Sequence, residues 1–114
     1  MSISRSIIVV DDELELACLF KEFLKNQGYN VVSFTDPVLA LEYFKETADK
    51  HSLIITDLRM PGICGIDLAK KVREFDNKIK ILIYLLSILR RFKSKTYPYL
   101  DQTAPLLFQM RMRS

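Results

Sequence analysis

The sequence predicts an α/β fold, a doubly wound parallel sheet. Four short apolar segments typical of buried strands alternate with segments of helical periodicity, in the order βαβαβαβ up to residue 83. Strands that are joined through helices form right-handed βαβ units and therefore a parallel sheet. The chain has 114 residues, 49% of them hydrophobic and 27% charged, which suits one globular domain with one core.

The first predicted unit is a strand at 7–10 followed by a helix. Residues 7–10 form an unbroken apolar run, typical of a strand buried on both faces, and they lead into the acidic run DDE at 11–13. Gly28 suits the position just after a helix end. Cys18, beside apolar positions of the helix, is predicted to pack in the core. Five apolar residues recur at the i, i+3, i+4, i+7 and i+8 spacing of an amphipathic helix: Leu16, Leu19, Phe20, Phe23 and Leu24.

The following units repeat this pattern. A second strand is predicted at 31–34, and Asp36-Pro37 marks a helix start, with a capping acid before a proline in the first turn. Further strands are predicted at 53–56 and 79–83. The helices between them have apolar stripes formed by Ala40, Leu41, Phe44 and Ala48, and by Leu68, Ala69 and Val72.

The pattern ends after residue 83. We expect the core of the one domain at 1–85 without a separate output domain, and an atypical basic segment at 86–114, in which the last helix and strand units are degenerate or missing. Residues 1–85 contain 11 basic and 13 acidic side chains, whereas 86–114 contain 6 basic side chains and one acid. The basic segment has no aromatic interleaving and no nucleic-acid motif, so no nucleic-acid partner is predicted.

The sequence disfavours three further classes of protein: membrane proteins, proteins stabilised by metal-binding or disulfide-bonded cysteines, and secreted proteins. The longest apolar run, 81–89, includes Ser87 and is far shorter than the roughly 20 residues of a membrane span, so no membrane association is predicted. The two cysteines form neither a metal-binding spacing nor a disulfide framework. No secretory signal precedes the first strand, and we therefore expect a cytoplasmic protein.

Three acids follow strands that are distant in sequence. Asp11 and Asp12 end the first strand, and Asp57 ends the third. The carboxyl ends of parallel strands lie along one edge of a sheet, so these acids are predicted to converge there. Carboxylates packed together repel and need a cation or a retained proton, and hard oxygen ligands suit Mg²⁺. Each acid alone has a simpler interpretation: residues 11–13 as favourable charge at a helix start, and Asp57 as a strand end before a Pro-Gly turn.

The motifs that contain these acids resemble the receiver domain of two-component response regulators. The motifs are IIVVDDE at 7–13, LIITDLRMPG at 53–62 and GIDLAKKVR at 65–73. The resemblance implies a CheY-like, flavodoxin-like (βα) fold with Asp57 as phosphoacceptor. It also implies Mg²⁺ held by Asp57, by Asp12 directly, by Asp11 through water, and by the backbone carbonyl of Arg59. The phosphoryl donor would be a histidine kinase or a histidine phosphotransfer protein of a phosphorelay.

The sequence departs from this family after residue 83. Receivers have a threonine or serine at the end of the fourth strand, near Leu85 here, and Ser87 is a hydroxyl candidate two residues late. They also have a Lys-Pro pair at the fifth strand end, where this chain has Ala104-Pro105. Two explanations are open: the chain is a divergent receiver, or the reading frame changes near residue 83. The coding nucleotides would decide between them.

Two other functions are compatible with parts of this pattern. An Mg²⁺-dependent phosphohydrolase with an aspartyl nucleophile often needs a second acid two residues later, where this chain has Arg59. A binding module that keeps the fold without signalling is favoured by the missing threonine and lysine.

Cys64 is interpreted as a variable loop position, and His51 as a surface residue on the rim opposite Asp57. Any hydrolysis of the phosphorylated aspartate would be incidental, so the chain is not predicted to be an enzyme.

Overall fold

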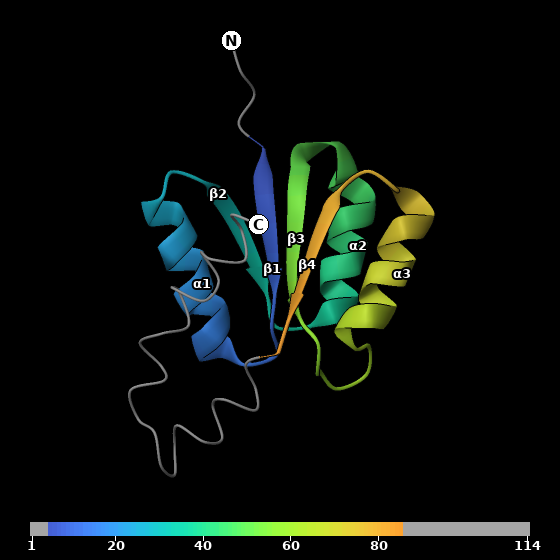
Figure 1. Ribbon diagram of the computed structural model, residues 1–114, viewed down its shortest axis with the longest axis horizontal. Coiled ribbons are helices and arrows are strands. Elements are labelled where there is room, and N and C mark those ends of the chain that lie inside the picture. Colours follow the sequence, from blue (N-terminus) through green and yellow to red (C-terminus); the bar gives the residue numbers. More distant parts are fainter. Residues whose placement is uncertain (1–4, 86–114) are drawn as a thin grey trace. The chain divides into compact units, whose positions relative to one another are not determined.

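A computed structural model describes residues 5–85 of the chain, and Figure 1 shows their arrangement. The elements, in chain order, are β1 (Ser6–Val10), α1 (Leu14–Asn26), β2 (Asn30–Phe34), α2 (Pro37–Thr47), a short 3₁₀ helix (Ala48–Lys50), β3 (His51–Asp57), α3 (Gly65–Phe75) and β4 (Lys80–Tyr84). All paired strands are parallel, and their order in the sheet is β2-β1-β3-β4. The predicted doubly wound α/β fold is confirmed for this part of the chain.

The sheet separates α1 from the pair α2 and α3, as Figure 1 shows. Side chains alternate along a strand, so each buried strand supplies both layers of the core. On the side of α2 and α3, Ile8, Val10 and Ile54 pack in a cluster with residues of these helices, including Phe44 and Leu68. On the side of α1, the helix buries Leu16, Ala17, Phe20 and Leu24.

The predicted signals at two helix ends are confirmed. Gly28 has φ +99°, the left-handed conformation that glycine adopts without a steric penalty. The Gly28 N–H donates to the Lys25 carbonyl and the Tyr29 N–H donates to the Leu24 carbonyl, which is the Schellman arrangement. At the start of α2, Asp36 Oδ1 accepts a hydrogen bond of 2.9 Å from the Val38 N–H.

The structure corrects the prediction for Cys18. This residue is exposed and does not pack in the core. Its neighbours Leu16, Ala17 and Phe20 define the buried face of α1, and a residue two positions after Leu16 lies about 200° around the helix from it. Sequence proximity to apolar residues was therefore a poor guide to its face.

The described chain up to Tyr84 forms one compact unit. Within residues 5–85, every helix is too short or too polar to span a bilayer. The predicted basic segment at 86–114, with Ser87 and the Ala104-Pro105 pair, lies outside the described residues.

Candidate functional site

The structure brings Asp11, Asp12 and Asp57 together at the carboxyl edge of the sheet. One carboxylate oxygen from each residue lies within 4.8 Å of the others. β1 and β3 are neighbouring strands, and Val10 is paired with Thr56. The residues that follow this pair, Asp11 and Asp57, therefore lie next to each other at the edge of the sheet. The convergence depends on parallel pairing, because an antiparallel neighbour would present its other end at this edge.

Asp11 has a second role at the start of α1. Its Oδ1 accepts a hydrogen bond of 2.8 Å from the N–H of Glu13, which is the N-cap residue of the helix. The Asp11 N–H donates to the Phe34 carbonyl of β2 at 3.0 Å. The helix-start interpretation and the acid-cluster interpretation of residues 11–13 therefore both hold for Asp11.

Asp57 is a fully buried acid with unsatisfied oxygens. Its side chain is 0% exposed, and neither carboxylate oxygen has a hydrogen-bond partner within the described part of the chain. Burial, followed by the nearby charge of Asp11, raises the pKa of Asp57 to about 7. The Arg59 and Leu58 amides partly offset this rise, although the Leu58 N–H donates its own hydrogen bond to the Tyr84 carbonyl at 2.7 Å. A buried carboxylate without partners needs a proton or a cation.

Asp11 is held in a similar environment. Burial raises its pKa to about 6, and the charges of Asp12 and Glu13 act in the same direction. Hydrogen bonds from the Tyr84 hydroxyl and the Glu13 N–H oppose the rise. Asp12 is exposed, so the cluster has one acid in contact with solvent and two that are covered.

The segment after Asp57 turns sharply into α3. The Gly65 N–H donates to the Leu58 carbonyl at 2.8 Å, so the start of α3 is bound to the end of β3. Gly62, with φ +82°, allows the reversal between them. Arg59 lies in this turn with an exposed side chain, and a metal-binding role for its carbonyl stays a prediction.

Cys64 precedes α3 as its N-cap residue. Its Sγ lies 3.4 Å from Asp67 Oδ2 in the first turn of the helix, and the side chain is half-buried. The interpretation of Cys64 as a variable loop position stays a prediction.

Tyr84 belongs to the same site, although the sequence did not single it out. Tyr84 is the last residue of β4, and its hydroxyl donates to Asp11 Oδ2 at 2.5 Å. Its burial near Asp11 raises its pKa, so the phenol stays protonated and acts as a donor. The sequence signal for Tyr84 is its place at the end of the fourth strand, where the family resemblance implies a threonine or serine instead.

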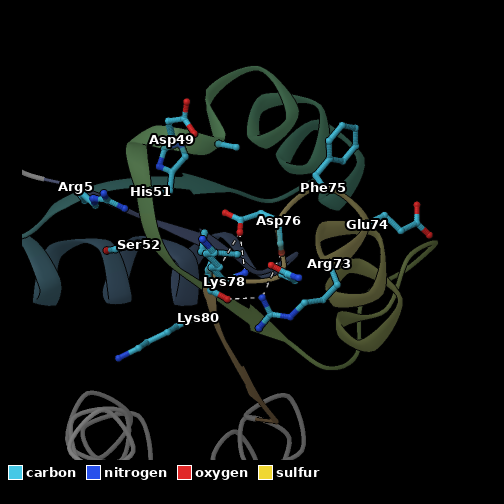
Figure 2. Close-up of a pocket in the computed structure, with 13 residues that line it drawn as sticks. Arg5, Asp49, His51, Ser52, Arg73, Glu74, Phe75, Asp76, Lys78 and Lys80 are labelled. Carbon is cyan, nitrogen blue, oxygen red and sulfur yellow. Dashed lines mark hydrogen bonds between the residues drawn. The ribbon is translucent and has the colours of Figure 1, made fainter.

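The opposite edge of the sheet holds a cavity of about 770 Å³, shown in Figure 2, and His51 is one of the residues that line it. The prediction that His51 is a surface residue is wrong, because its side chain is only 2% exposed. β3 begins two residues earlier than predicted, so His51 packs under α2, with its ring 5.3 Å from that of Tyr43. Its Nε2 lies 2.8 Å from Thr47 Oγ1, and burial lowers its pKa.

This cavity is separate from the acid cluster, and two side chains of its lining, Arg73 and Asp76, form hydrogen bonds with nearby backbone groups. Arg73 Nη1 donates to the Ile79 carbonyl, and Asp76 Oδ1 accepts from the Lys78 N–H at 2.8 Å. Figure 2 shows these bonds between α3 and β4. They stabilise the connection that leads into β4.

The fold and the acid cluster define a class of protein: a parallel α/β domain with a group of carboxylates at the carboxyl edge of its sheet. The family described as response regulator receiver domain matches residues 7–88. The chain belongs to this family.

Individual relatives agree with this assignment. The chain is 35% identical over 78 residues to the phosphoglycerate transport system transcriptional regulatory protein PgtA of Salmonella typhimurium, covering 68% of this chain and 18% of PgtA. It is 40% identical over 71 residues to the regulatory protein VanRc of Enterococcus gallinarum, covering 62% and 30%. The chain thus spans less than a third of the length of these two relatives.

Solved structures share the fold. The response regulator TrrA of Thermotoga maritima, in complex with Mg²⁺ and BeF, is 29% identical with a TM-score of 0.67, covering 83% of this chain and 79% of TrrA. A complex of histidine kinase ThkA with TrrA gives 33% identity and a TM-score of 0.64, covering 71% and 68%.

Proposed function

We propose that this chain is a phosphoacceptor in a two-component phosphorelay and that Asp57 receives the phosphoryl group. The observation that carries the proposal is the carboxylate of Asp57, buried and without a hydrogen-bond partner in residues 5–85, beside Asp11 and Asp12. Membership of the receiver family supports the same function. The donor is a phosphohistidine on a histidine kinase or a phosphotransfer protein, in line with the ThkA–TrrA complex.

The residues present fit a magnesium ion. Three carboxylates with oxygens within 4.8 Å of one another offer the hard oxygen ligands that Mg²⁺ prefers. Asp12 and Asp57 would hold the ion with the Arg59 carbonyl, and Asp11 would hold it through water. The TrrA structure with Mg²⁺ and BeF supports this choice of ion. When bound, Mg²⁺ neutralises the carboxylates and the phosphoryl oxygens that would otherwise repel one another.

The transfer uses the Asp57 carboxylate as nucleophile. One of its oxygens forms a bond to phosphorus while the bond from phosphorus to the donor's histidine nitrogen breaks, and that nitrogen keeps the electron pair. Asp57 must be ionised to attack, but burial raises its pKa to about 7 and so favours the protonated form. A nearby cation has the opposite effect, because it stabilises the ionised carboxylate that reacts. The turn after Asp57 places the exposed Pro61 and Gly62 at this edge, where they are accessible to a partner protein.

The reaction is stoichiometric, with one phosphoryl group per chain, and the chain does not turn over a substrate. A phosphohydrolase is disfavoured because Arg59 occupies the position where such enzymes often have a second acid. A cytoplasmic location stays a prediction of the sequence.

Intact-mass measurement tests the proposal. The folded protein is incubated with Mg²⁺ and a small phosphodonor such as phosphoramidate, and we expect the mass of one phosphoryl group to be added. Asp57→Asn should abolish the addition, whereas Asp49→Asn, an exposed acid at the other edge, should retain it. No addition to the folded wild type would favour the binding module, and repeated hydrolysis of an added phosphate ester would favour the hydrolase.

A further inference from the structure

Tyr84 reaches across the end of a strand to contact Asp11. In the sheet, β3 lies between β1 and β4, and Tyr84 is paired directly with Asp57. Neighbouring strands are about 4.8 Å apart, so β1 and β4 are separated by roughly 10 Å. The hydrogen bond of 2.5 Å from the Tyr84 hydroxyl to Asp11 therefore spans the end of β3, where Asp57 lies.

Tyr84 and Asp57 also lie on the same side of the sheet. Ile54 packs towards α2 and α3, so the alternation along β3 directs Asp57, three residues later, towards α1. Tyr84 is on this side too, because its ring centroid is 4.9 Å from that of Phe20 in α1. The phenol is thus held at its hydroxyl by Asp11 and along its ring by α1, over the position of the buried carboxylate.

We propose that Tyr84 is a gate that covers Asp57 and that closes through its hydrogen bond to Asp11. In the closed arrangement the side chain of Asp57 is 0% exposed. A phosphoryl donor gains access when the bond from Tyr84 to Asp11 breaks and the phenol moves away from the end of β3. Tyr84 thereby limits which donors react, since a donor must either wait for opening or displace the phenol. This inference deepens the proposed function and rests on it for the identity of the incoming group.

The size of the effect follows from the population of the open state. Minor conformations within a few kcal/mol are populated at about 0.1–10%, and the observed rate of a reaction that needs such a state is reduced by that fraction. Removing the hydroxyl deletes a hydrogen bond to a charged acceptor and should increase access to Asp57 about tenfold. Removing the whole phenol should increase it further, up to about 100-fold.

Thiol labelling tests the gate without any phosphoryl transfer. In a background of Cys18→Ser and Cys64→Ser, the change Asp57→Cys places one thiol at the covered position. We expect slow labelling by iodoacetamide in this variant, about tenfold faster labelling when Tyr84→Phe is added, and the fastest labelling with Tyr84→Ala. Tyr29→Phe is the matched control, because Tyr29 is 47% exposed, and it should leave the rate unchanged.

Equal labelling rates with and without Tyr84→Phe, in variants shown to be folded by circular dichroism, would overturn the gate. Tyr84→Phe keeps the ring against Phe20, so it carries the test even if Tyr84→Ala does not fold. Slower labelling in Tyr84→Phe would equally overturn it.

The rate of phosphorylation is the second measurement. With phosphoramidate and Mg²⁺, Tyr84→Phe should acquire the phosphoryl group about tenfold faster than the wild type. A slower reaction would mean that the hydroxyl assists transfer, which contradicts a gate. The two measurements separate the proposals. If Tyr84→Phe speeds labelling of the Asp57→Cys thiol but no protein that retains Asp57 is phosphorylated, the phosphoacceptor function alone is rejected. If Asp57 is phosphorylated but Tyr84→Phe changes neither the labelling rate nor the phosphorylation rate, the gate alone is rejected.

Discussion

Asp57 and Asp11 are acids whose surroundings oppose ionisation. Burial is the largest cause for both residues, and their mutual proximity adds to it for Asp57. The same arrangement that makes the carboxylates costly to ionise makes them effective ligands for a cation, because no hydrogen bond from residues 5–85 occupies the oxygens of Asp57. Burial of these carboxylates therefore both favours cation binding at the site and lowers the free energy of unfolding when they ionise.

This cost predicts a pH dependence of stability in metal-free protein. Between about pH 4 and 7 the folded protein keeps protons on Asp57 and Asp11 that the unfolded chain has released, so these residues lower the free energy of unfolding as the pH rises. We expect Asp57→Asn to become more stable relative to wild type with rising pH, by about 1–3 kcal/mol between pH 4.5 and 7.5, allowing for reorganisation of water and dipoles.

Urea unfolding at a series of pH values measures this difference. Asp49→Asn, exposed and remote from the cluster, is the matched control and should follow the wild type in parallel. A difference between Asp57→Asn and wild type that stays constant with pH would contradict the prediction.

At the scale of elements, the site depends on how β3 connects to α3. Gly65 begins α3 directly beside the end of β3, and an added Cβ would overlap the carbonyl oxygen of Asp57 and come within 3.1 Å of Leu58 Cα. Both contacts are with backbone atoms, so neither can be relieved by a side-chain rotation. Glycine at this position lets the helix start close enough to bury Leu68 and Val72 against the sheet.

We expect Gly65→Ala to reduce the free energy of unfolding by about 1–3 kcal/mol, the usual range for overpacking at a tight contact. Ile66→Ala, at the adjacent exposed position, should change it much less. Chemical denaturation of both variants measures the difference. Equal stabilities for Gly65→Ala and wild type would show that the junction yields without strain.

At the scale of the whole molecule, three acids from two strands form one site only in the folded state. A cation that binds this site stabilises the fold by mass action, because the unfolded chain does not bring the carboxylates together. Metal binding and folding stability are therefore coupled in this protein.

Adding Mg²⁺ at about 100 times its dissociation constant should raise the free energy of unfolding by about 2.7 kcal/mol at pH 7.5. Asp12→Asn should lose most of this stabilisation, since Asp12 is a proposed direct ligand, and Asp49→Asn should keep it. Thermal unfolding with and without Mg²⁺ provides the measurement. A wild-type protein whose stability does not change when Mg²⁺ is added would contradict the proposed site.

The sequence by itself determined the order of strands and helices, the parallel sheet and the convergence of Asp11, Asp12 and Asp57. These follow from local patterns and from one topological rule, that parallel strands end at the same edge. Only the tertiary structure decided that His51 is buried, that Cys18 is exposed and that Tyr84 contacts Asp11. These properties depend on where β3 begins, on how α1 is rotated against the sheet, and on the register that pairs Tyr84 with Asp57, none of which a local pattern specifies.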